Sequence, residues 1–463
     1  MKGRAAETPP VTKLEIWEQA QALHLARKYD EAEPLYDQLL TQNPNNPGLL
    51  ATLGTLYLQK GKIGLSICLL EASMKNGQRE SDALSNLAMA YKYSGQQEKA
   101  LKLFEESVKK NPNGQTLANY SALFIESGQD AKMEGICKRA IELAPEHPIS
   151  HWNLALAYLA TGRWDKAWDE HEWGLVNNCM RRDRELGGVP VWDGTPGKRV
   201  AIYGEQGLGD EIMFASMIPD VLKTNEVVIE CHTRLKTLFE KSFPGVPCYG
   251  EREDEMPTWP EHEPFDCRIS IGSLGKFYRR SRAAFPGTPY LKADPLASGE
   301  KFRVGISWTG GLKQGRVQKR SVPLSWWKSI FAVPGVEFVS LQYTDSDEEL
   351  DLMDTLGYSI KRPPEAKADD YYETARLVQS CDLVISVCTT VIHLAGALGV
   401  PCWVMTPKHP AWRYGNEGGM PWYRSVRLYR SPDVDKGAWR PVIERIGLDL
   451  DELLKSRKSE RAA

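Results

Sequence analysis

The chain has 463 residues, of which 42% are hydrophobic and 26% are charged, and its formal net charge is -3. This length exceeds what one hydrophobic core usually supports, so we expect more than one domain. The nearly balanced charge gives no electrostatic reason to expect nucleic acid or an anionic membrane as a partner.

Neither a signal peptide nor a membrane span is indicated. The N-terminus has no apolar segment, and no stretch approaches the roughly 18 uninterrupted apolar residues that a spanning helix needs. Nine cysteines lie between Cys68 and Cys402 without a CxxC pair or a Cys/His cluster. This pattern favours reduced interior thiols over a disulfide or zinc framework, so we expect a cytoplasmic protein without a metal site.

The first third of the sequence repeats with a step of 33 or 34 residues. In two registers of this repeat, mostly small side chains would let paired helices approach closely. These positions are Ala32, Ser66, Ala100, Met133 and Ala167, and, twelve residues before them, Ala20, Gly54, Ala88, Ser121 and Ala155. A third register, nine residues before the first, holds bulky side chains that would fill the space between helices: Leu23, Tyr57, Tyr91, Phe124 and Tyr158. The period predicts one helical hairpin per repeat.

Glycine and proline mark the predicted helix ends. Four glycines lie five residues before the first register: Gly61, Gly95, Gly128 and Gly162. Glycine ends a helix there in the left-handed conformation at little cost. Three prolines, twelve residues after the first register, would stop the second helix: Pro44, Pro112 and Pro145. Residues 14–178 therefore resemble the tetratricopeptide-repeat family, in five units, which implies a solenoid whose concave face grips peptides or partner proteins.

The last of these units departs from the pattern. His151 takes a packing place that an aromatic residue or leucine usually fills, and three tryptophans, Trp164, Trp168 and Trp173, crowd its second helix. Terminal repeats are atypical because one of their faces meets something other than a repeat. We expect these tryptophans to dock the solenoid onto the next domain.

A glycine- and proline-rich stretch follows and is typical of a linker. The pattern then changes to a strand at 199–205, a glycine turn at 206–210 and an apolar helix, with further strands at 227–232, 246–250 and 267–274. This order predicts a small doubly wound lobe. The turn lacks a full GxGxxG motif, and no acidic residue follows the second strand in the manner of NAD enzymes, which disfavours a redox domain.

Residues 302–310 open a second lobe of the same kind, and strands and helices alternate through 407. Two such lobes leave a cleft between their strand ends, where ligands of α/β sheets bind. Four cations lie within eight residues after the first strand, where they would meet phosphate or form a solvated charged loop: Lys313, Arg316, Lys319 and Arg320. Thr389 and Thr390 open a helix near Val391, so their hydroxyl and N–H groups would face a bound anion.

Several motifs in this half occur in the order typical of one enzyme family. The segments SWTGG, KRSVPL, FVSLQY, ETARLVQSCDLVISVCTTVIHLAGALG and PAWRYGNEGGMPWYRSVRLYR resemble the donor-binding half of heptosyltransferase-type glycosyltransferases, particularly bacterial forms fused to tetratricopeptide repeats. GEQGLGDEIMFASMIP is similar to their first acceptor-side loop. The resemblance covers nearly all of 199–430. It implies two Rossmann-like lobes in the GT-B arrangement and an inverting, metal-independent reaction.

The resemblance also implies roles for individual residues. Inverting transfer needs a general base for the acceptor and positive groups for the leaving diphosphate. The family's base corresponds to Asp210, which by itself would also suit a helix N-cap. Lys319 and Arg320 correspond to the basic position that neutralises the diphosphate, and His393 to a contact with phosphate or ribose, although a lone helical histidine is more often a packing residue. The implied donor-binding residues are Gly207, Gly209, Trp308, Thr309, Lys319, Arg320, Gln342, Cys388, Thr389, Thr390 and His393.

Three features leave alternatives open. Cys388 stands where the family usually has aspartate, and a thiol accepts hydrogen bonds from sugar hydroxyls less well, so either the donor differs or activity is weaker. On a glycine-rich loop, four side chains either stack on the nucleotide base or pack down a lid: Trp412, Arg413, Trp422 and Tyr423. The C-terminal segment predicts an amphipathic helix that braces the cleft and a charged, disordered tail over 455–463.

The predicted architecture is an all-α tetratricopeptide-repeat solenoid followed by two α/β Rossmann-like lobes. Its boundaries are a disordered N-terminus at 1–13, the solenoid at 14–180, a linker at 181–198, an acceptor-side lobe at 199–298, a nucleotide-sugar lobe at 299–435, and a C-terminal helix and tail at 436–463. We expect a glycosyltransferase that uses a nucleotide-sugar and no cofactor, with an acceptor hydroxyl on a protein recruited by the repeats or on a glycan or lipid-linked sugar. A non-catalytic repeat adaptor with a degenerate transferase domain and an epimerase of the same fold are the alternatives.

Overall fold

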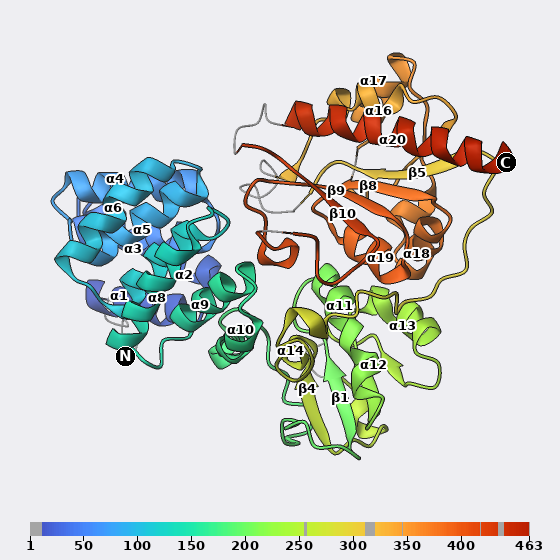
Figure 1. Ribbon diagram of the computed structural model, residues 1–463. Coiled ribbons are helices and arrows are strands. Elements are labelled where there is room, and N and C mark those ends of the chain that lie inside the picture. The colour runs from blue at the N-terminus through green and yellow to red at the C-terminus, as the bar shows by residue number, and fades with distance from the viewer. Residues whose placement is uncertain are drawn as a thin grey trace, which may run out of the picture. The chain divides into compact units, whose positions relative to one another are not determined.

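The computed structural model describes residues 12–462 except 254–256, 311–319, 345, 417 and 434–438. The predicted disorder at 1–13 lies outside the described residues as far as residue 11, and the first helix begins at Lys13. The chain forms two compact units (Figure 1). One holds the residues up to Phe124 and Gly135–Ser150, and the other holds Ile125–Glu134 and everything from His151 onward.

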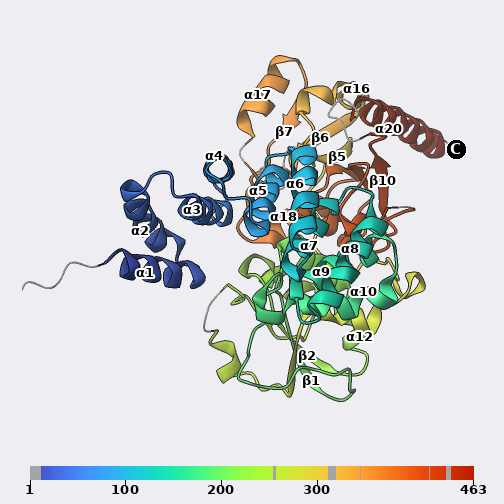
Figure 2. The same ribbon diagram turned by 90° about the vertical axis from the view of Figure 1, so that its left-hand side faces the viewer.

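The N-terminal region is helical, and its first six helices pair as three consecutive hairpins (Figure 2). The helices of the region are α1 (Lys13–Leu25), α2 (Tyr29–Gln42), α3 (Pro47–Gln59), α4 (Ile63–Lys75), α5 (Ser81–Tyr93), α6 (Gln97–Lys110), α7 (Gly114–Ser121), α8 (Asp130–Leu143), α9 (Pro148–Ala160) and α10 (Trp164–His171). All ten residues of the two small registers are buried. At Gly54 an added Cβ would lie only 2.8 Å from Leu70 Cγ, so the absence of a side chain permits this helix contact.

The turns within the hairpins have the backbone that the glycine register predicts. Gly61, Gly95, Gly128 and Gly162 all have φ between 71° and 83°. In the first hairpin Arg27 occupies the same position with φ of 60°, so a non-glycine residue adopts the left-handed conformation there. Helices α2, α6 and α8 each end two residues before a proline of the predicted register.

Two of the three tryptophans of the last repeat pack against the α/β part of the chain. The Trp168 indole is buried and donates a hydrogen bond to the Arg279 carbonyl at 2.8 Å. An added Cβ on Gly275 would lie 2.6 Å from its ring. Trp164 lies against Phe285, with ring centroids 4.8 Å apart. Trp173 instead stacks on His151 inside the repeat, so it does not take part in this docking.

The first parallel sheet has the strand order β3-β2-β1-β4. Its strands are β1 (Arg199–Tyr203), β2 (Glu226–Glu230), β3 (Cys248–Tyr249) and β4 (Cys267–Ser270), and its helices are α11 (Leu208–Phe214), α12 (Ile218–Val221), α13 (Lys236–Ser242) and α14 (Gly275–Tyr278). The segment predicted as a linker is packed against this sheet, because Val191 forms a parallel bridge with Arg268 and the Trp192 N–H donates to the Arg268 carbonyl at 2.8 Å.

The second parallel sheet has the order β10-β9-β8-β5-β6-β7. Its strands are β5 (Phe302–Ser307), β6 (Val336–Ser340), β7 (Ile360–Lys361), β8 (Leu383–Val387), β9 (Cys402–Thr406) and β10 (Val426–Arg430). Helices α16 (Lys328–Phe331), α17 (Asp347–Thr355) and α20 (Trp439–Ala462) lie over one face, and α18 (Tyr371–Gln379) and α19 (Thr390–Leu398) over the other (Figure 1).

The long C-terminal helix α20 belongs to the core of this second sheet. Its Ile443, Ile446 and Leu450 are buried in one cluster with Val304 and Ile306 of β5. The predicted disorder of the charged tail is wrong for the backbone, since α20 runs to Ala462 as one continuous helix. The helix braces a sheet face rather than the end of the sheet where the site lies.

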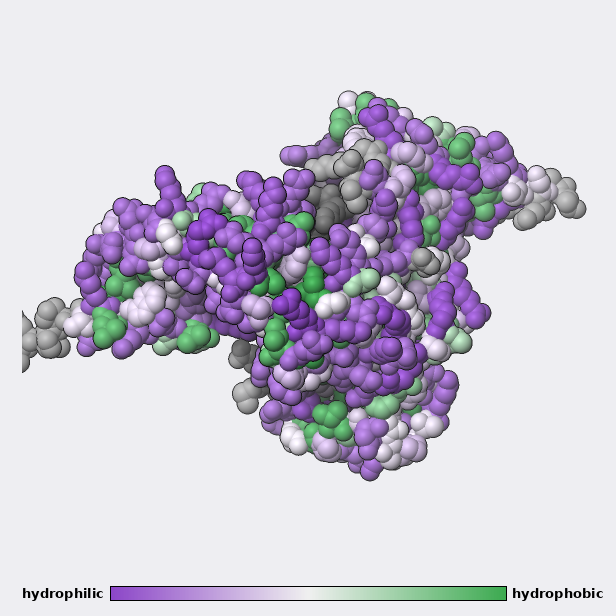
Figure 3. All heavy atoms as spheres, turned by 60° about the vertical axis from the view of Figure 1, so that its left-hand side comes forward, coloured by the Kyte–Doolittle hydropathy of each residue, from purple (hydrophilic) through white to green (hydrophobic). Residues whose placement is uncertain are grey.

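The surface is polar with scattered apolar residues. On the face shown in Figure 3, hydrophilic residues predominate and hydrophobic ones occur in small groups. The most exposed large apolar side chains, such as Leu25 and Leu448, lie far apart in the sequence. None of the described helices combines the length and the apolar composition that a membrane crossing requires.

Buried charges fix the turn between β1 and α11. Arg181, from the segment before the first sheet, is fully buried and donates to Glu205 at 3.0 Å, Glu172 at 3.0 Å and Ser273 at 2.8 Å. Glu211 accepts the His232 N–H at 3.0 Å and pairs with Arg252 at 2.5 Å. Because a buried polar or charged group without a partner is costly, these contacts hold the start of α11 in one place.

Replacing Gly275 with alanine tests the docking of the last repeat. The new methyl group would meet the Trp168 ring, which is buried on all sides, so we expect a loss of about 1–3 kcal/mol in the free energy of unfolding. Gly64→Ala is the matched control, because Gly64 lies on an exposed helix with open space beside it and alanine favours helices there. Equal effects of the two changes in thermal and denaturant unfolding would contradict the tight packing at Gly275.

Glu211→Gln tests the buried carboxyl group. Burial raises the pKa of Glu211 from 4.5 to about 8, although Arg252 opposes this shift. A carboxyl pKa that is higher in the folded chain contributes stability below its unfolded value, and this contribution is lost as pH rises through the folded value. We therefore expect the Tm of the natural chain to fall by several degrees relative to Glu211→Gln between about pH 5 and about pH 9.

The control for this comparison is Glu240→Gln, which removes an exposed carboxylate paired with Lys236. Its Tm should follow that of the natural chain at every pH. A Tm difference between Glu211→Gln and the natural chain that stays constant over this pH range would rule out the raised pKa.

Candidate functional site

The carboxyl ends of the two sheets bring two helix starts into contact. Helix α11 follows β1, and α19 follows β8; the two helices lie side by side (Figure 1). An added Cβ on Gly209 would lie 3.2 Å from His393 Cδ2 and 3.4 Å from Thr390 Oγ1. Since any larger side chain at 209 would push α19 away, this glycine sets the approach of the two first turns.

Asp210 lies on the first turn of α11 and is paired with an arginine of the second sheet's loop region. Arg413 Nε donates to Asp210 Oδ1 at 2.6 Å, and Arg413 Nη2 contacts the same oxygen. The two side chains are 17% and 21% exposed, so the pair is close to the surface without being fully solvated. Asp210 is not the N-cap of the helix, because Gly207 occupies that position and α11 begins at Leu208.

The aromatic residues of the glycine-rich loop that carries Arg413 are packed inward. Trp412, Trp422 and Tyr423 are all buried. Trp412 and Trp422 each lie against Phe214 at the end of α11, with ring centroids 6.3 and 5.8 Å apart. Of the two predicted alternatives, these side chains therefore adopt the packed one in this structure, and they hold Arg413 over Asp210.

His393 is a buried, neutral side chain. Its Nδ1 lies 3.2 Å from the Tyr423 hydroxyl, and its ring packs against Tyr414 and Tyr423. Burial, with a further contribution from the nearby Arg413 charge, lowers the pKa of His393 to about 3. At neutral pH the imidazole therefore carries no positive charge that would attract a phosphate.

Thr389 and Thr390 lie at the start of α19. Thr389 is the N-cap residue and Thr390 is the first helical residue, so the predicted helix start is displaced by only one position. The Thr389 hydroxyl lies 3.3 Å from Ser386 Oγ and does not cap the helix. The Thr389 side chain therefore leaves the first-turn N–H groups uncapped at the positive end of the helix dipole, although the Ile392 N–H donates to the Thr389 carbonyl at 3.3 Å.

Arg320, Gly310 and Cys388 lie together next to this helix start. An added Cβ on Gly310 would lie 2.8 Å from the Cys388 carbonyl and 3.4 Å from Arg320 Cβ. The Arg320 guanidinium pairs with Glu126 of the repeat region at 2.7 Å. Lys319, the other half of the predicted basic position, lies outside the described residues, as do the cations at 313 and 316.

Cys388 is a buried thiol whose Sγ lies 3.7 Å from the Met405 carbonyl. Burial raises its pKa to about 11, although the charge of Arg320 works in the opposite direction. The side chain is therefore an uncharged thiol at the place where the resembling family has a carboxylate. It neither offers a negative charge to Arg320 nor acts as a thiolate nucleophile near neutral pH.

Arg430 is a second cation in this region; it ends the segment PAWRYGNEGGMPWYRSVRLYR, but it was not among the predicted site residues. Its Nη2 donates to the Tyr414 carbonyl at 3.0 Å, whereas its buried Nη1 has no hydrogen-bond partner in the part of the chain that the structure describes. Burial lowers the pKa of Arg430. Its position as the last residue of β10, at the carboxyl end of a parallel sheet, is the signal that identifies it.

Trp308 and Gln342 maintain the backbone beside this site. The Trp308 side chain is fully buried in the core and donates to Glu349 at 2.6 Å. The Gln342 side-chain carbonyl accepts the N–H groups of Trp308 and Thr309, both at 3.2 Å. These residues therefore fix the turn after β5, while Thr309 and the exposed Gly207 are the predicted positions nearer the surface.

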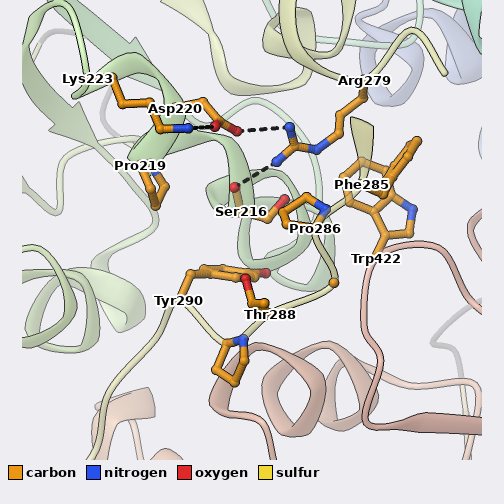
Figure 4. Close-up of a pocket in the computed structure, with 12 residues that line it drawn as sticks. Ser216, Pro219, Asp220, Lys223, Arg279, Phe285, Pro286, Thr288, Tyr290 and Trp422 are labelled. Atoms are coloured by element: carbon orange, nitrogen blue, oxygen red, sulfur yellow. Dashed lines mark hydrogen bonds and ion pairs between the residues drawn. The ribbon is translucent and has the colours of Figure 1, made fainter. Parts of the chain in front are cut away.

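A separate cavity of about 260 Å³ lies beside the first sheet (Figure 4). Arg279 and Asp220 form an ion pair of 2.9 Å on its wall. Trp422, predicted to stack on the base or to pack down a lid, also lines the cavity, whereas Asp210 and the implied donor-binding residues do not. The hydroxyl of Tyr290, another wall residue, lies 3.4 Å from the Tyr423 hydroxyl, which contacts His393 in turn. A continuous set of polar contacts thus joins this cavity to the helix starts.

Among all the described residues, no three His, Cys, Asp or Glu side chains are grouped in a way that would bind a metal ion.

Comparisons with known proteins match both parts of the chain. Tetratricopeptide-repeat family models match residues 23–72, 81–113 and 137–170. Protein FlbA of Caulobacter vibrioides is 29% identical over 466 residues, a match that covers 94% of this chain and 72% of that protein.

Solved structures of tetratricopeptide-repeat proteins each match about a third of the chain. The tetratricopeptide-repeat protein TTC0263 of Thermus thermophilus is 22% identical, with 36% of this chain and 91% of that chain covered and a TM-score of 0.33. YrrB, a tetratricopeptide-repeat protein with an unusual peptide-binding site, is 17% identical, with 36% and 92% covered and a TM-score of 0.28. The N-terminal region of this chain therefore consists of tetratricopeptide repeats, and the whole chain is a homologue of the larger FlbA.

Proposed function

We propose that this chain is an inverting, metal-independent glycosyltransferase that moves a sugar from a nucleotide-sugar to an acceptor hydroxyl. In this proposal the two parallel sheets are the Rossmann-like lobes of a GT-B enzyme, with the acceptor side on the first sheet and the donor side on the second. The repeats recruit the acceptor. No cofactor takes part, because the nucleotide-sugar is itself a substrate.

The observation that carries the proposal is the contact between the first turns of α11 and α19. It brings a carboxylate, Asp210, from the end of one sheet to the helix N-terminus at Thr389 and Thr390 at the end of the other. Group transfer from a diphosphate needs these two kinds of group on opposite sides of the reacting carbon. The ends of parallel strands are also where α/β proteins bind their ligands.

The reaction assigns one role to each side. The Asp210 carboxylate takes the proton of the acceptor hydroxyl while the acceptor oxygen forms its bond to the anomeric carbon from the face opposite the leaving group. The bond between that carbon and the diphosphate oxygen breaks, and the nucleoside diphosphate leaves with the electron pair. The configuration at the carbon is inverted because attack and departure occur on opposite faces.

Charge on the donor side comes from arginines and helix amides. Arg430 has an unsatisfied Nη1, and Arg320 lies next to Cys388, so both are suited to bind phosphate oxygens. The N-terminal end of α19, which has no side-chain cap, adds a partial positive charge at the same place. His393 is not part of this cationic set, since it is neutral; it supports α19 and Gly209 by packing.

The repeats supply the reason to propose a protein acceptor. Tetratricopeptide repeats form surfaces that bind peptides or extended segments of other proteins. A recognition surface covalently joined to the reacting site raises the local concentration of the acceptor and so compensates for weak binding at the site itself. A glycan or lipid-linked sugar is the second candidate acceptor.

One specific observation favours the alternative function, a repeat adaptor without catalytic activity. Both proposed reacting charges are already paired within the chain, Asp210 with Arg413 and Arg320 with Glu126, and Cys388 replaces the family's aspartate. In an adaptor these pairs would be permanent structural links. In an enzyme they must exchange for substrate contacts during each turnover.

Asp210→Asn separates the two functions. The amide cannot take the acceptor proton, so we expect the release of nucleoside diphosphate from UDP-, GDP- or ADP-sugars to fall at least about 100-fold, while nucleotide affinity stays unchanged. Asp220→Asn is the matched control, because Asp220 is similarly exposed and also pairs with an arginine, 2.9 Å away. Equal turnover in Asp210→Asn and the natural chain would rule out the base assignment.

Arg430→Gln tests the donor side. Loss of a cation from the phosphate position should weaken the binding of UDP, GDP or ADP by about tenfold, measured by calorimetry with the full chain. Arg427→Gln is the control on the same strand, since Arg427 pairs with Asp449 on α20 at 2.7 Å. If both variants bind the nucleotides as well as the natural chain does, Arg430 does not contact the donor.

A further inference from the structure

One turn of the repeats lies against the loops of the second sheet. It is the turn before α8, whose Asp130 accepts a hydrogen bond from Asn416 Nδ2 at 2.7 Å. An added Cβ on Gly128 would overlap the ring of His409, whereas the equivalent Gly61 and Gly95 have open space around them. Gly128 therefore serves a close contact as well as the left-handed backbone that all these turns share.

Glu126 in this turn has an unusual backbone for its residue type. Its φ is 59°, in the left-handed region that favours glycine and disfavours a residue with a long side chain. Such a conformation persists only where the surroundings enforce it, and it occurs often at functional sites. Here it directs the carboxylate onto Arg320 Nη2 at 2.7 Å, with only 15% of the Glu126 side chain and 14% of the Arg320 side chain exposed.

Arg320 is surrounded by groups that make it a site for an anion. Burial disfavours its charged form, but Glu126, together with Cys388 and Tyr414, raises the pKa of Arg320 above its ordinary value. The neighbouring Cys388 is a neutral thiol and offers no competing negative charge. A guanidinium binds carboxylate and phosphate oxygens with the same geometry, so Glu126 occupies the position that a phosphate oxygen would take.

We propose that Glu126 is a competing anion built into the repeats, which holds Arg320 until the diphosphate of the donor displaces it. This inference rests on the proposed function, because it takes the ligand of Arg320 to be a nucleoside diphosphate. It assigns to the fourth repeat a role in setting donor affinity, and it makes the resting pair of Glu126 and Arg320 an autoinhibitory contact. Donor binding and the position of this turn are then linked, so each shifts the other.

The test compares nucleotide binding in full-length variants. We expect Glu126→Gln to bind UDP, GDP or ADP and inorganic pyrophosphate about fivefold to tenfold more tightly than the natural chain, because the amide no longer competes with the phosphate charge. Glu126→Gly serves as a second variant, since glycine suits the left-handed backbone and removes any concern about folding. Calorimetry gives the affinities, and Arg320→Gln shows whether they depend on Arg320.

Glu134→Gln is the matched control. Glu134 lies in the same segment and forms an ion pair of the same 2.7 Å length, but with Arg163. Its loss changes the net charge of the chain by the same amount and should leave nucleotide affinity unchanged. A gain in Glu134→Gln equal to that in Glu126→Gln would attribute the effect to net charge and overturn the proposal.

The remaining outcomes separate this inference from the proposed function. Nucleotide binding that depends on Arg320 but is unchanged or weaker in both Glu126 variants would overturn the competing-anion role and leave the transferase proposal standing. Absence of binding to every nucleotide and to pyrophosphate in the natural chain and in both Glu126 variants would overturn both. Tighter binding in both variants, lost again when Arg320→Gln is added, supports both.

Discussion

The contact between the first turns of α11 and α19 is the constraint on which the site depends. It exists because both sheets are parallel, so the helix after a central strand starts at the same edge of each sheet. It is close because residue 209 has no side chain. The loop that carries Arg413 is joined to this contact through the hydrogen bond from Arg413 to Asp210.

Nearly all the described charged side chains of this region are paired with other side chains of the same chain. Asp210 pairs with Arg413, and Arg320 pairs with Glu126. The buried pair of Arg181 and Glu205 anchors the turn between β1 and α11. Charges that are partly withdrawn from water interact strongly, so a ligand that replaces one member of a pair must supply the same sign of charge. Under the proposed function, a ligand that displaces Glu126 from Arg320 would therefore need charged oxygens, and neutral ligands of similar shape would be disfavoured.

Much of the fold follows from local patterns in the sequence. The buried small residues of the repeats, the glycine turns and the order of strands and helices are each encoded within a few neighbouring residues, such as Gly61 or the run 199–205, and all of them are present in the structure. The packing of the segment around Val191 was not predictable, because its bridge to Arg268 joins residues far apart in the chain. The helical tail was not predicted, because its charged and polar composition suggested disorder. Such a segment still forms helix when it continues a helix whose first turns are fixed in the core.

The sequence predicted which residues lie at the candidate site better than it predicted which of them contact one another. The threonines at the start of α19 and the glycine turn before Asp210 come from recognisable motifs. By contrast, the pairing of Asp210 with Arg413 spans 203 positions and that of Arg320 with Glu126 spans 194, so no local pattern reports either one. Arg430 was missed for the same reason, since only the strand order shows that the end of β10 lies at this edge.

Gly209 also limits how the two sheets can move. Because the two helix starts already touch there, the sheets cannot be brought closer together at this point, and any rotation between them has the contact as its fulcrum. Points far from a fulcrum travel further than points near it. Asp210, the adjacent residue, would thus keep an almost constant distance from α19 during such a rotation, while distances between the far ends of the two sheets would change most.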